Sequence, residues 1–184
     1  MKPNTAQPLR AVIVSTRYGW VGIVLSESRV KRLTLPCNSR SEILRQIKDI
    51  PVNIEQANAK ESGNIPRQIE EYFMGQRDRF DCELDLSGST PFQRAVWQSA
   101  MEIPYGEIRS YQWVARRIGK MNAYRAAGQA LARNPIPIII PCHRVIYSGG
   151  KLGGFGGKAN IKDFKRRLLS LEGAQVPDDP EHPH

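Results

Sequence analysis

The chain has 184 residues, of which 40% are hydrophobic, enough for one medium domain or two small ones. Its formal net charge of +9 favours an anionic partner, but net charge does not define a fold. The three cysteines, Cys37, Cys82 and Cys142, are too few and too widely spaced for a disulfide framework or a zinc knuckle. No apolar leader or 18-residue apolar stretch supports secretion or membrane insertion. We therefore expect a protein of a reducing compartment, cytoplasmic or, in a eukaryote, nuclear.

The first half of the chain has the pattern of a small scaffold. Alternating apolar residues over 9–35 predict an antiparallel sheet. Ser41 is expected to cap a short helix that stops before Pro51. A second helix is predicted from about Ile65 to Met74, because its apolar residues follow helical spacing.

The charge balance changes near residue 90. Residues 1–90 carry 13 Lys and Arg against 11 Asp and Glu, whereas residues 91–173 carry 14 against 4. The preceding stretch, Asp81–Ser89, is polar and rich in turn residues, as domain boundaries are. We expect a scaffold domain at 1–85, a basic second domain at 86–173 and a flexible tail at 174–184.

Helices dominate the predicted second domain. Thr90 and Pro91 are typical of a helix start and predict a helix that runs to Met101. Ser110 is expected to cap a helix to about Ile118, followed by a turn and a helix over 123–133. This arrangement occurs in DNA-binding proteins and equally in ordinary antiparallel helix pairs. A glycine-rich loop at 149–157 precedes the last predicted helix, at about 161–171.

The predicted helix over 123–133 consists mostly of small residues. A helix that reads bases in the major groove needs several long polar side chains, whereas Arg125 is the single long cation of its first turn. Close backbone approach with little base-edge chemistry is typical of minor-groove binding. Packing against another helix is the alternative explanation. The small residues are Ala123, Ala126, Ala127, Gly128, Ala130 and Ala132.

A thiol stands beside an imidazole in the segment Pro141–Val145. The preceding apolar run, Ile136–Ile140, predicts a buried strand or extended loop. His143 could accept the proton of Cys142 and so favour the reactive thiolate. A small core cysteine beside a structural histidine would give the same pattern. Near a minor-groove helix, a reactive thiol would imply chemistry on a base that has left the stack.

Taken in order, these motifs resemble the O6-alkylguanine-DNA alkyltransferases, also called methylated-DNA-protein-cysteine methyltransferases. The likeness covers most of residues 69–173, and the first 65 residues are only loosely similar. The matching segments are Tyr72–Gly75, Thr90–Gln93, Val96–Trp97, Ile103–Glu107, Ser110–Tyr111, Arg125–Gly128, Asn134–Pro135, Pro141–Val145, Leu168–Leu169 and Glu172–Gly173.

The resemblance implies an α+β fold. A small N-terminal α/β domain of RNase H-like type would precede a mainly α, winged-helix-like DNA-binding domain that carries the active-site cysteine. The implied function is DNA repair: O6-alkylguanine is flipped from the duplex and its alkyl group passes irreversibly to the protein in a single turnover. The implied partner is double-stranded DNA, bound through the minor groove by a monomer without cofactor or metal. Activity on O4-alkylthymine is left open.

The resemblance also implies roles for individual residues. Cys142 would accept the alkyl group, His143 would act as its base through a water molecule, and Glu172 would orient His143. Tyr111 would donate toward guanine N3. Asn134 would act as a hinge before Pro135, ending the helix in a left-handed or extended conformation.

The remaining implied roles concern the lesion and the DNA. Arg125 would fill the space left by the flipped nucleotide, beside a minor-groove contact lined by Ala126 and Ala127, and Gly128 would also belong to the DNA-binding residues. The carbonyl groups of Cys142 and Val145 would accept from the guanine amine. In the glycine-rich wall, the N–H of Gly156 would reach O6, and Phe155 stands where many relatives have tyrosine. The loop over 158–164 is longer than the family spacing, and its role is left open.

Three other functions compete with this interpretation. A non-catalytic lesion-binding relative would lack the thiol, which argues against it here. A cysteine hydrolase would need an oxyanion hole and would turn over an ester repeatedly. A transcription factor would bind undamaged DNA sequence-specifically, which the small-residue helix disfavours. The sequence does not tell whether Cys37 and Cys82 pair.

Overall fold

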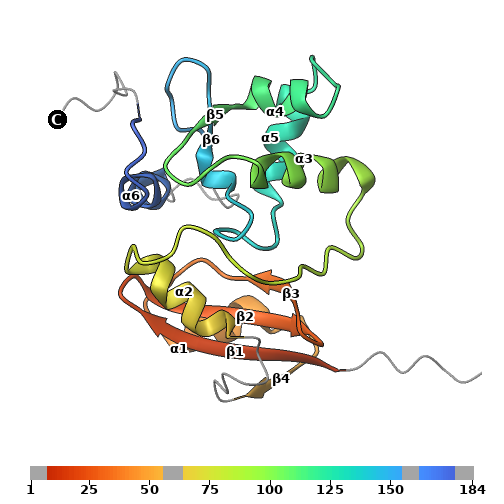
Figure 1. Cartoon of the computed structure of the whole chain (residues 1–184). Coiled ribbons are helices and arrows are strands. Elements are labelled where there is room, and N and C mark those ends of the chain that lie inside the picture. Colours follow the sequence, from red (N-terminus) through yellow and green to blue (C-terminus); the bar gives the residue numbers. More distant parts are fainter. Residues whose placement is uncertain (1–7, 56–63, 155–161, 177–184) are drawn as a thin grey trace, which may run out of the picture. The chain divides into compact units, whose positions relative to one another are not determined.

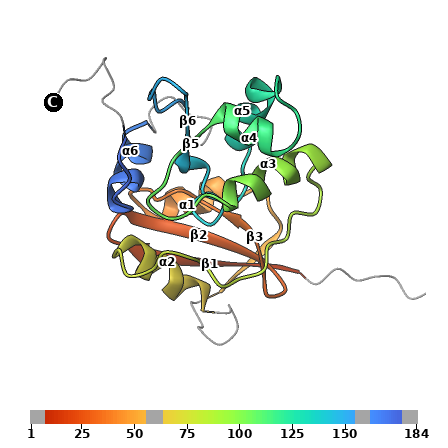
Figure 2. The same cartoon turned by 45° about the horizontal axis from the view of Figure 1, so that its top comes forward.

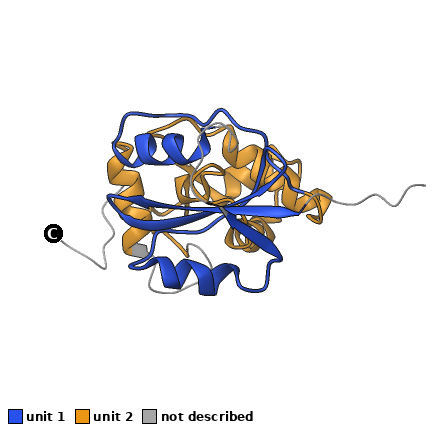
Figure 3. Cartoon of the chain, turned by 90° about the horizontal axis from the view of Figure 1, so that it is seen from below, with its two compact units in different colours: residues 1–86 blue, residues 87–184 orange. Residues whose placement is uncertain are grey.

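The computed structural model describes residues 8–55, 64–154 and 162–176, and it has the mixed α+β character expected from the sequence. The chain forms two compact units, residues 1–86 and residues 87–184, shown in different colours in Figure 3. No helix in the described ranges has the length and apolar character required to cross a membrane.

A four-stranded sheet forms the centre of the first unit (Figure 1). The strand order is β3-β2-β1-β4, with β1 to β3 antiparallel and β4 parallel to β1. The predicted antiparallel sheet is therefore confirmed, but β4 was not expected, because it spans four residues after Pro51 and leaves Ile54 exposed. The strands are β1 (Leu9–Thr16), β2 (Gly19–Ser26), β3 (Arg29–Leu33) and β4 (Val52–Glu55).

Two helices, α1 (Arg40–Ile47) and α2 (Ile65–Phe73), cover opposite faces of this sheet (Figure 3). Burial on both faces explains why Val21–Leu25 of β2 is buried at every position instead of alternating. The packing of α1 is close, because a Cβ atom on Gly22 would lie 2.5 Å from a methyl group of Ile43. A side chain at position 22 would push α1 away from the sheet.

The structure corrects the predicted cap of α1 and confirms the predicted range of α2. The cap of α1 is Ser39, not Ser41: its side chain accepts a hydrogen bond from the backbone N–H of Glu42 at 3.2 Å. A cap lies just before the first helical residue and satisfies an N–H two or three residues later, whereas Ser41 is already inside the helix. The prediction of α2 over 65–74 is confirmed to within one residue.

The second unit contains the three predicted helices α3 (Pro91–Met101), α4 (Tyr111–Arg117) and α5 (Tyr124–Ala132), which pack against one another (Figure 2). Thr90 and Gln93 form a reciprocal capping box at the start of α3. Trp97 is buried and its indole N–H donates to the Ala130 carbonyl at 2.9 Å, which ties α3 to α5.

The segment over 136–140 differs from the prediction. It is buried as expected, but it forms a tight turn and neither a strand nor an extended loop: the N–H of Ile140 donates to the carbonyl of Ile136 at 2.9 Å. Ile138 has φ +77°, a left-handed conformation that is costly for a β-branched residue, and its side chain is buried. An apolar run cannot distinguish a buried turn from a buried strand by periodicity.

Three short elements complete the second unit. A single 3-10 turn, η1 (Cys142–Arg144), leads directly into β6 (Val145–Ile146). This strand pairs in parallel with β5 (Arg109–Ser110), which immediately precedes α4. The chain then reaches α6 (Lys162–Leu171). The two-residue strands are too short for any sequence pattern to predict.

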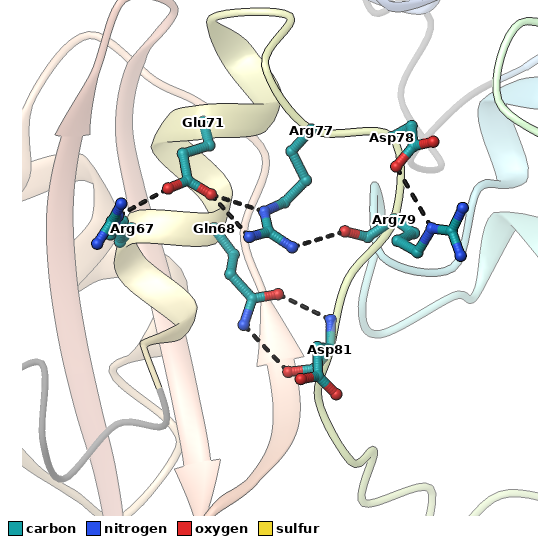
Figure 4. Close-up of polar contacts among 7 residues, drawn as sticks. All are labelled: Arg67, Gln68, Glu71, Arg77, Asp78, Arg79 and Asp81. Carbon is teal, nitrogen blue, oxygen red and sulfur yellow. Dashed lines mark hydrogen bonds and ion pairs between the residues drawn. The ribbon is translucent and has the colours of Figure 1, made fainter.

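A buried glutamine holds the segment that follows α2 (Figure 4). The side chain of Gln68 donates to the Asp81 carbonyl at 3.0 Å and accepts from the Asp81 N–H at 2.8 Å. Two arginines of the same cluster, Arg67 and Arg77, pair with Glu71. Gln68 thus satisfies both backbone groups of a residue that belongs to no strand or helix.

We expect Gln68→Ala to lower the free energy of unfolding by about 2 kcal/mol, because two backbone groups lose their partners. Arg79→Ala is the control: the Arg79 side chain is 85% exposed, so its loss should cost less than about 0.5 kcal/mol. Urea unfolding of both variants measures the difference. Equal stabilities would contradict a clamping role for Gln68.

Candidate active site

Asn134 and Cys142 are joined by a side-chain contact at the end of the 134–142 segment. The Asn134 amide nitrogen donates to the Cys142 Sγ at 3.1 Å and to the Ile140 carbonyl at 2.8 Å. Its amide oxygen accepts from the Ile136 N–H at 2.9 Å. Asn134 does not have a positive φ, so the left-handed alternative is excluded. The Asn134 side chain thus connects the Ile136 N–H, the Ile140 carbonyl and the Cys142 sulfur, and so holds the loop that carries the thiol.

A buried ion cluster lies next to the thiol turn, centred on the Glu172 carboxylate. His143 Nε2 lies 2.7 Å from Glu172 Oε1. Arg144 donates from Nε to Oε2 at 2.8 Å and from Nη2 to Oε1 at 3.0 Å. The N–H of Gly106 donates to Oε2 at 3.3 Å. The carboxylate thus accepts hydrogen bonds from two separate segments of the chain, as a buried charge requires.

The carboxylate of Glu172 determines which ring nitrogen of His143 carries the proton. Burial alone would raise the pKa of Glu172, but the hydrogen bonds and charges of His143 and Arg144 outweigh it and lower that pKa to about 2. Burial lowers the pKa of His143 despite the neighbouring carboxylate. An ionised Glu172 requires a donor at Nε2, so in a neutral imidazole Nδ1 carries the lone pair. His143 is therefore arranged to accept a proton at Nδ1.

The thiol itself is held mainly in its protonated form. Burial raises the pKa of Cys142, and the hydrogen bond from Asn134 and the charge of Lys165 oppose that effect only in part. That His143 accepts the proton of Cys142 stays a prediction. Reaction at this sulfur requires that the proton leaves as the new bond forms.

Lys165 was missed by the sequence analysis. Its side chain, on α6, is completely buried, and Nζ donates to the carbonyl groups of Val145, at 2.6 Å, and Leu152. Burial lowers the pKa of Lys165 to about 8, and the nearby Cys142 opposes this shift. A lysine in a basic helix normally indicates a solvated face, so its position in the core was not visible from the residue type.

Tyr111, the first residue of α4, lies close to the same sulfur. It is nearly buried, and burial, with smaller contributions from Tyr147 and Cys142, raises its pKa. The phenol therefore stays protonated and remains a hydrogen-bond donor. The ammonium group of Lys165 lies 5.8 Å from the centre of its ring.

Helix α5 separates its small residues between surface and core. Arg125 and Ala126 are exposed, and the Arg125 guanidinium lies 5.7 Å from the centre of the Tyr124 ring. Ala127 is fully buried, so the expectation that it lines a DNA contact is wrong: its methyl group packs inside the unit. Gly128 faces Tyr111, whose ring carbons lie 3.6 Å from the position of an added Cβ.

The other predicted site residues are Val145, Phe155, Gly156 and the loop over 158–164. Val145 is buried, and its carbonyl, the expected acceptor for a guanine amine, already accepts from Lys165. Phe155 and Gly156 lie outside the described residues, as do residues 158–161 of the expected long loop. The rest of that loop, residues 162–164, is the first turn of α6, where the acidic side chain of Asp163 favours the start of a helix.

The described cysteines have no disulfide, and the described part of the chain contains no metal-ligand cluster. Cys37, Cys82 and Cys142 each carry a free thiol. No group of three His, Cys, Asp or Glu side chains comes together within residues 8–55, 64–154 and 162–176.

The comparisons with known proteins agree on one class. The family model "6-O-methylguanine DNA methyltransferase, DNA binding domain" matches residues 91–174, which contain all of the elements just described. A methylated-DNA–protein-cysteine methyltransferase of Methanosarcina barkeri is 55% identical over 106 residues, which cover 58% of this chain and 65% of the relative. One of Mycobacterium bovis is 52% identical over 112 residues, covering 61% and 66%. These matches span just under two thirds of each relative's length.

Solved structures extend the similarity to nearly the whole chain. The crystal structure of Mycobacterium tuberculosis O6-methylguanine methyltransferase has 35% identity and a TM-score of 0.72, over 93% of this chain and 96% of that one. M. tuberculosis OGT in complex with DNA has 37% identity and a TM-score of 0.74, covering 91% and 95%. The chain belongs to the methylated-DNA–protein-cysteine methyltransferases, an enzyme family of DNA repair.

We expect Glu172→Gln to lower the free energy of unfolding by about 3 kcal/mol or more near neutral pH, because it leaves Arg144 buried without a counter-charge. The folded-state pKa of Glu172 lies below its ordinary value of 4.5, so its ionised form stabilises the fold above that pH. This stabilisation is lost as the pH falls toward about 2. The difference in free energy of unfolding between the wild type and Glu172→Gln should therefore shrink as the pH falls from 4.5 toward about 2.

Urea unfolding at several pH values tests this expectation. Glu102→Gln is the matched control, because Glu102 pairs with Arg117 at the surface and its side chain is 46% exposed. That change should cost less than about 0.5 kcal/mol. A Glu172→Gln effect as small as the control, or one that does not depend on pH, would contradict the role of the buried carboxylate.

Proposed function

We propose that this chain repairs duplex DNA by moving the alkyl group of O6-alkylguanine onto the Sγ of Cys142, once per molecule. The observation that carries the proposal is a single constellation: a buried thiol held by Asn134, next to an imidazole whose tautomer is set by a buried carboxylate. This is the arrangement of nucleophile, base and orienting group that activates thiols in other enzymes.

The proposed reaction is a direct displacement. The Sγ–carbon bond forms while the bond between the alkyl carbon and guanine O6 breaks, and the bonding electron pair stays on the guanine. The thiol proton passes to Nδ1 of His143 through a water molecule, and the resulting imidazolium is stabilised by Glu172. The guanine anion then takes up a proton to give the normal base. A thioether is a poor leaving group, so each chain reacts once.

Tyr111 supports the departure of the base. Its phenol stays protonated because burial raises its pKa, so it can donate a hydrogen bond to guanine N3 as negative charge develops. The Val145 carbonyl has a second lone pair beside the one that accepts from Lys165, and this pair can accept from the guanine amine.

The proposed DNA contact uses the exposed start of α5 in the minor groove, with the chain acting as a monomer. Arg125 and Ala126 are exposed there, and Arg125 would enter the base stack when the damaged nucleotide leaves it. Base flipping is required because guanine O6 cannot reach a buried thiol from within a duplex.

Finer fold assignments accompany this proposal. The first unit is proposed to be RNase H-like, since the order β3-β2-β1-β4 with a parallel β4 supports it. The second unit is proposed to be winged-helix-like, with the helix pair α4 and α5 beside the β5–β6 pair.

Mixing the protein with a duplex that contains one O6-methylguanine should add one methyl group to each chain, located on Cys142 by intact-mass and peptide analysis. Product should stop at one equivalent, because nothing removes a thioether. Cys142→Ser should bind the duplex and give no transfer. Release of repaired DNA beyond one equivalent, or repeated ester hydrolysis by the wild type, would favour a cysteine hydrolase; binding without transfer would favour a lesion-binding protein.

We expect Arg125→Ala to slow methyl transfer from the duplex on the order of tenfold or more. Without the arginine, no side chain fills the space that the flipped nucleotide leaves, so the cost of unstacking that nucleotide is not offset. Transfer from the free base O6-benzylguanine needs no unstacking and should be unaffected. Arg116→Ala, on the exposed surface of α4, removes the same charge and controls for weaker non-specific binding. Equal losses with both substrates, or in both variants, would argue against this role.

A further inference from the structure

Tyr147 is a large aromatic side chain next to the site that the proposed reaction leaves without a role. It follows β6 directly, and 53% of its surface is exposed. The centre of its ring lies 5.1 Å from that of Tyr111, with the two rings inclined by 56°. One ring of the pair is nearly buried and the other presents an open face beside the site, where a flat aromatic partner can stack on it.

The backbone fixes this tyrosine in place. The N–H of Tyr147 donates to the Lys151 carbonyl at 2.9 Å, and the N–H of Gly150 donates back to the Tyr147 carbonyl at 3.0 Å. Gly150 adopts φ +84°, as such a closed turn requires. The next residue, Ser148, donates to the side chain of Gln112 at 3.1 Å. Gln112 follows Tyr111 in α4, so the turn is tied to the helix end that carries the buried tyrosine.

Both rings meet the same glycine. A Cβ atom added to Gly153 would lie 2.9 Å from the Tyr111 hydroxyl oxygen and 2.9 Å from a ring carbon of Tyr147. Gly153 also has φ +71°, which other residues rarely adopt. The glycine therefore gives the two rings room to converge, and the inner ring of the pair is within electrostatic reach of Cys142.

We propose that Tyr147 is a substrate-binding residue whose ring stacks on the purine that reaches Cys142, as the outer member of an aromatic pair with Tyr111. This inference rests on the proposed function. Stacking needs a flat face that is held at low entropic cost, and the anchored turn supplies it. Every base has such a face, so the contact contributes affinity whatever alkyl group the purine carries.

The test compares Tyr147→Ala and Tyr147→Phe with the wild type on two substrates, free O6-benzylguanine and a duplex with O6-methylguanine. Tyr147→Ala should lower the second-order rate with the free base about tenfold, whereas Tyr147→Phe, which keeps the ring, should stay within about twofold. The loss on the duplex should be smaller, because phosphate contacts also hold that substrate. The rate of thiol alkylation by iodoacetamide and the unfolding temperature should not change in either variant.

Each other outcome counts against the inference. An unchanged or faster rate in Tyr147→Ala would mean that the ring does not stack or that it obstructs the base. A parallel loss with iodoacetamide would assign the effect to the thiol or to folding. A wild type that repairs the duplex yet rejects the free base would also overturn it, since a stacking ring should hold an isolated purine. A wild type that transfers no alkyl group from either substrate would overturn the proposed function as well.

Discussion

The candidate site depends on one buried negative charge. The Glu172 carboxylate accepts from His143, from two nitrogens of Arg144 and from the N–H of Gly106, so it connects the end of α6 to the thiol turn and to the loop before β5. Arg144 also donates to the Ile103 carbonyl at 2.7 Å, which extends the same network to the end of α3. Because a buried cation without a partner is so costly, this geometry has few alternatives.

Burial also makes the Cys142 thiol less reactive, because it favours the protonated form. A neutral, buried sulfur is a poor nucleophile toward electrophiles in solution, since the thiolate is the reactive form. Burial raises the pKa of Cys142, while Asn134 and the charge of Lys165 reduce that effect without cancelling it. In the proposed single-turnover reaction, a protonated resting state would protect the nucleophile from wasteful alkylation. Proton removal by His143 would then have to coincide with the arrival of the substrate.

The sequence predicted what depends on local chemistry. Thr90, Pro91 and Gln93 specify the start of α3 through backbone N–H groups next to them in the chain, and the structure has that capping box. Contacts between distant residues were not predictable in the same way. The burial of Lys165 and Ala127 and the turn at 136–140 are set by tertiary packing, which composition does not report. The motif around Cys142 predicted the nucleophile, but only the fold revealed that its pKa is raised.

The position of Glu172 in the chain also bears on synthesis. Its carboxylate closes a site whose imidazole lies 29 residues earlier, so a growing polypeptide on the ribosome has made Cys142, His143 and Arg144 well before their anionic partner exists. Domains generally fold as units, and here the unit lacks its central counter-charge until α6 emerges. Until α6 is made, Cys142 is not buried by that helix, and no carboxylate fixes the tautomer of His143. Nascent chains should thus be the form of this protein whose thiol is most open to oxidation or adventitious alkylation.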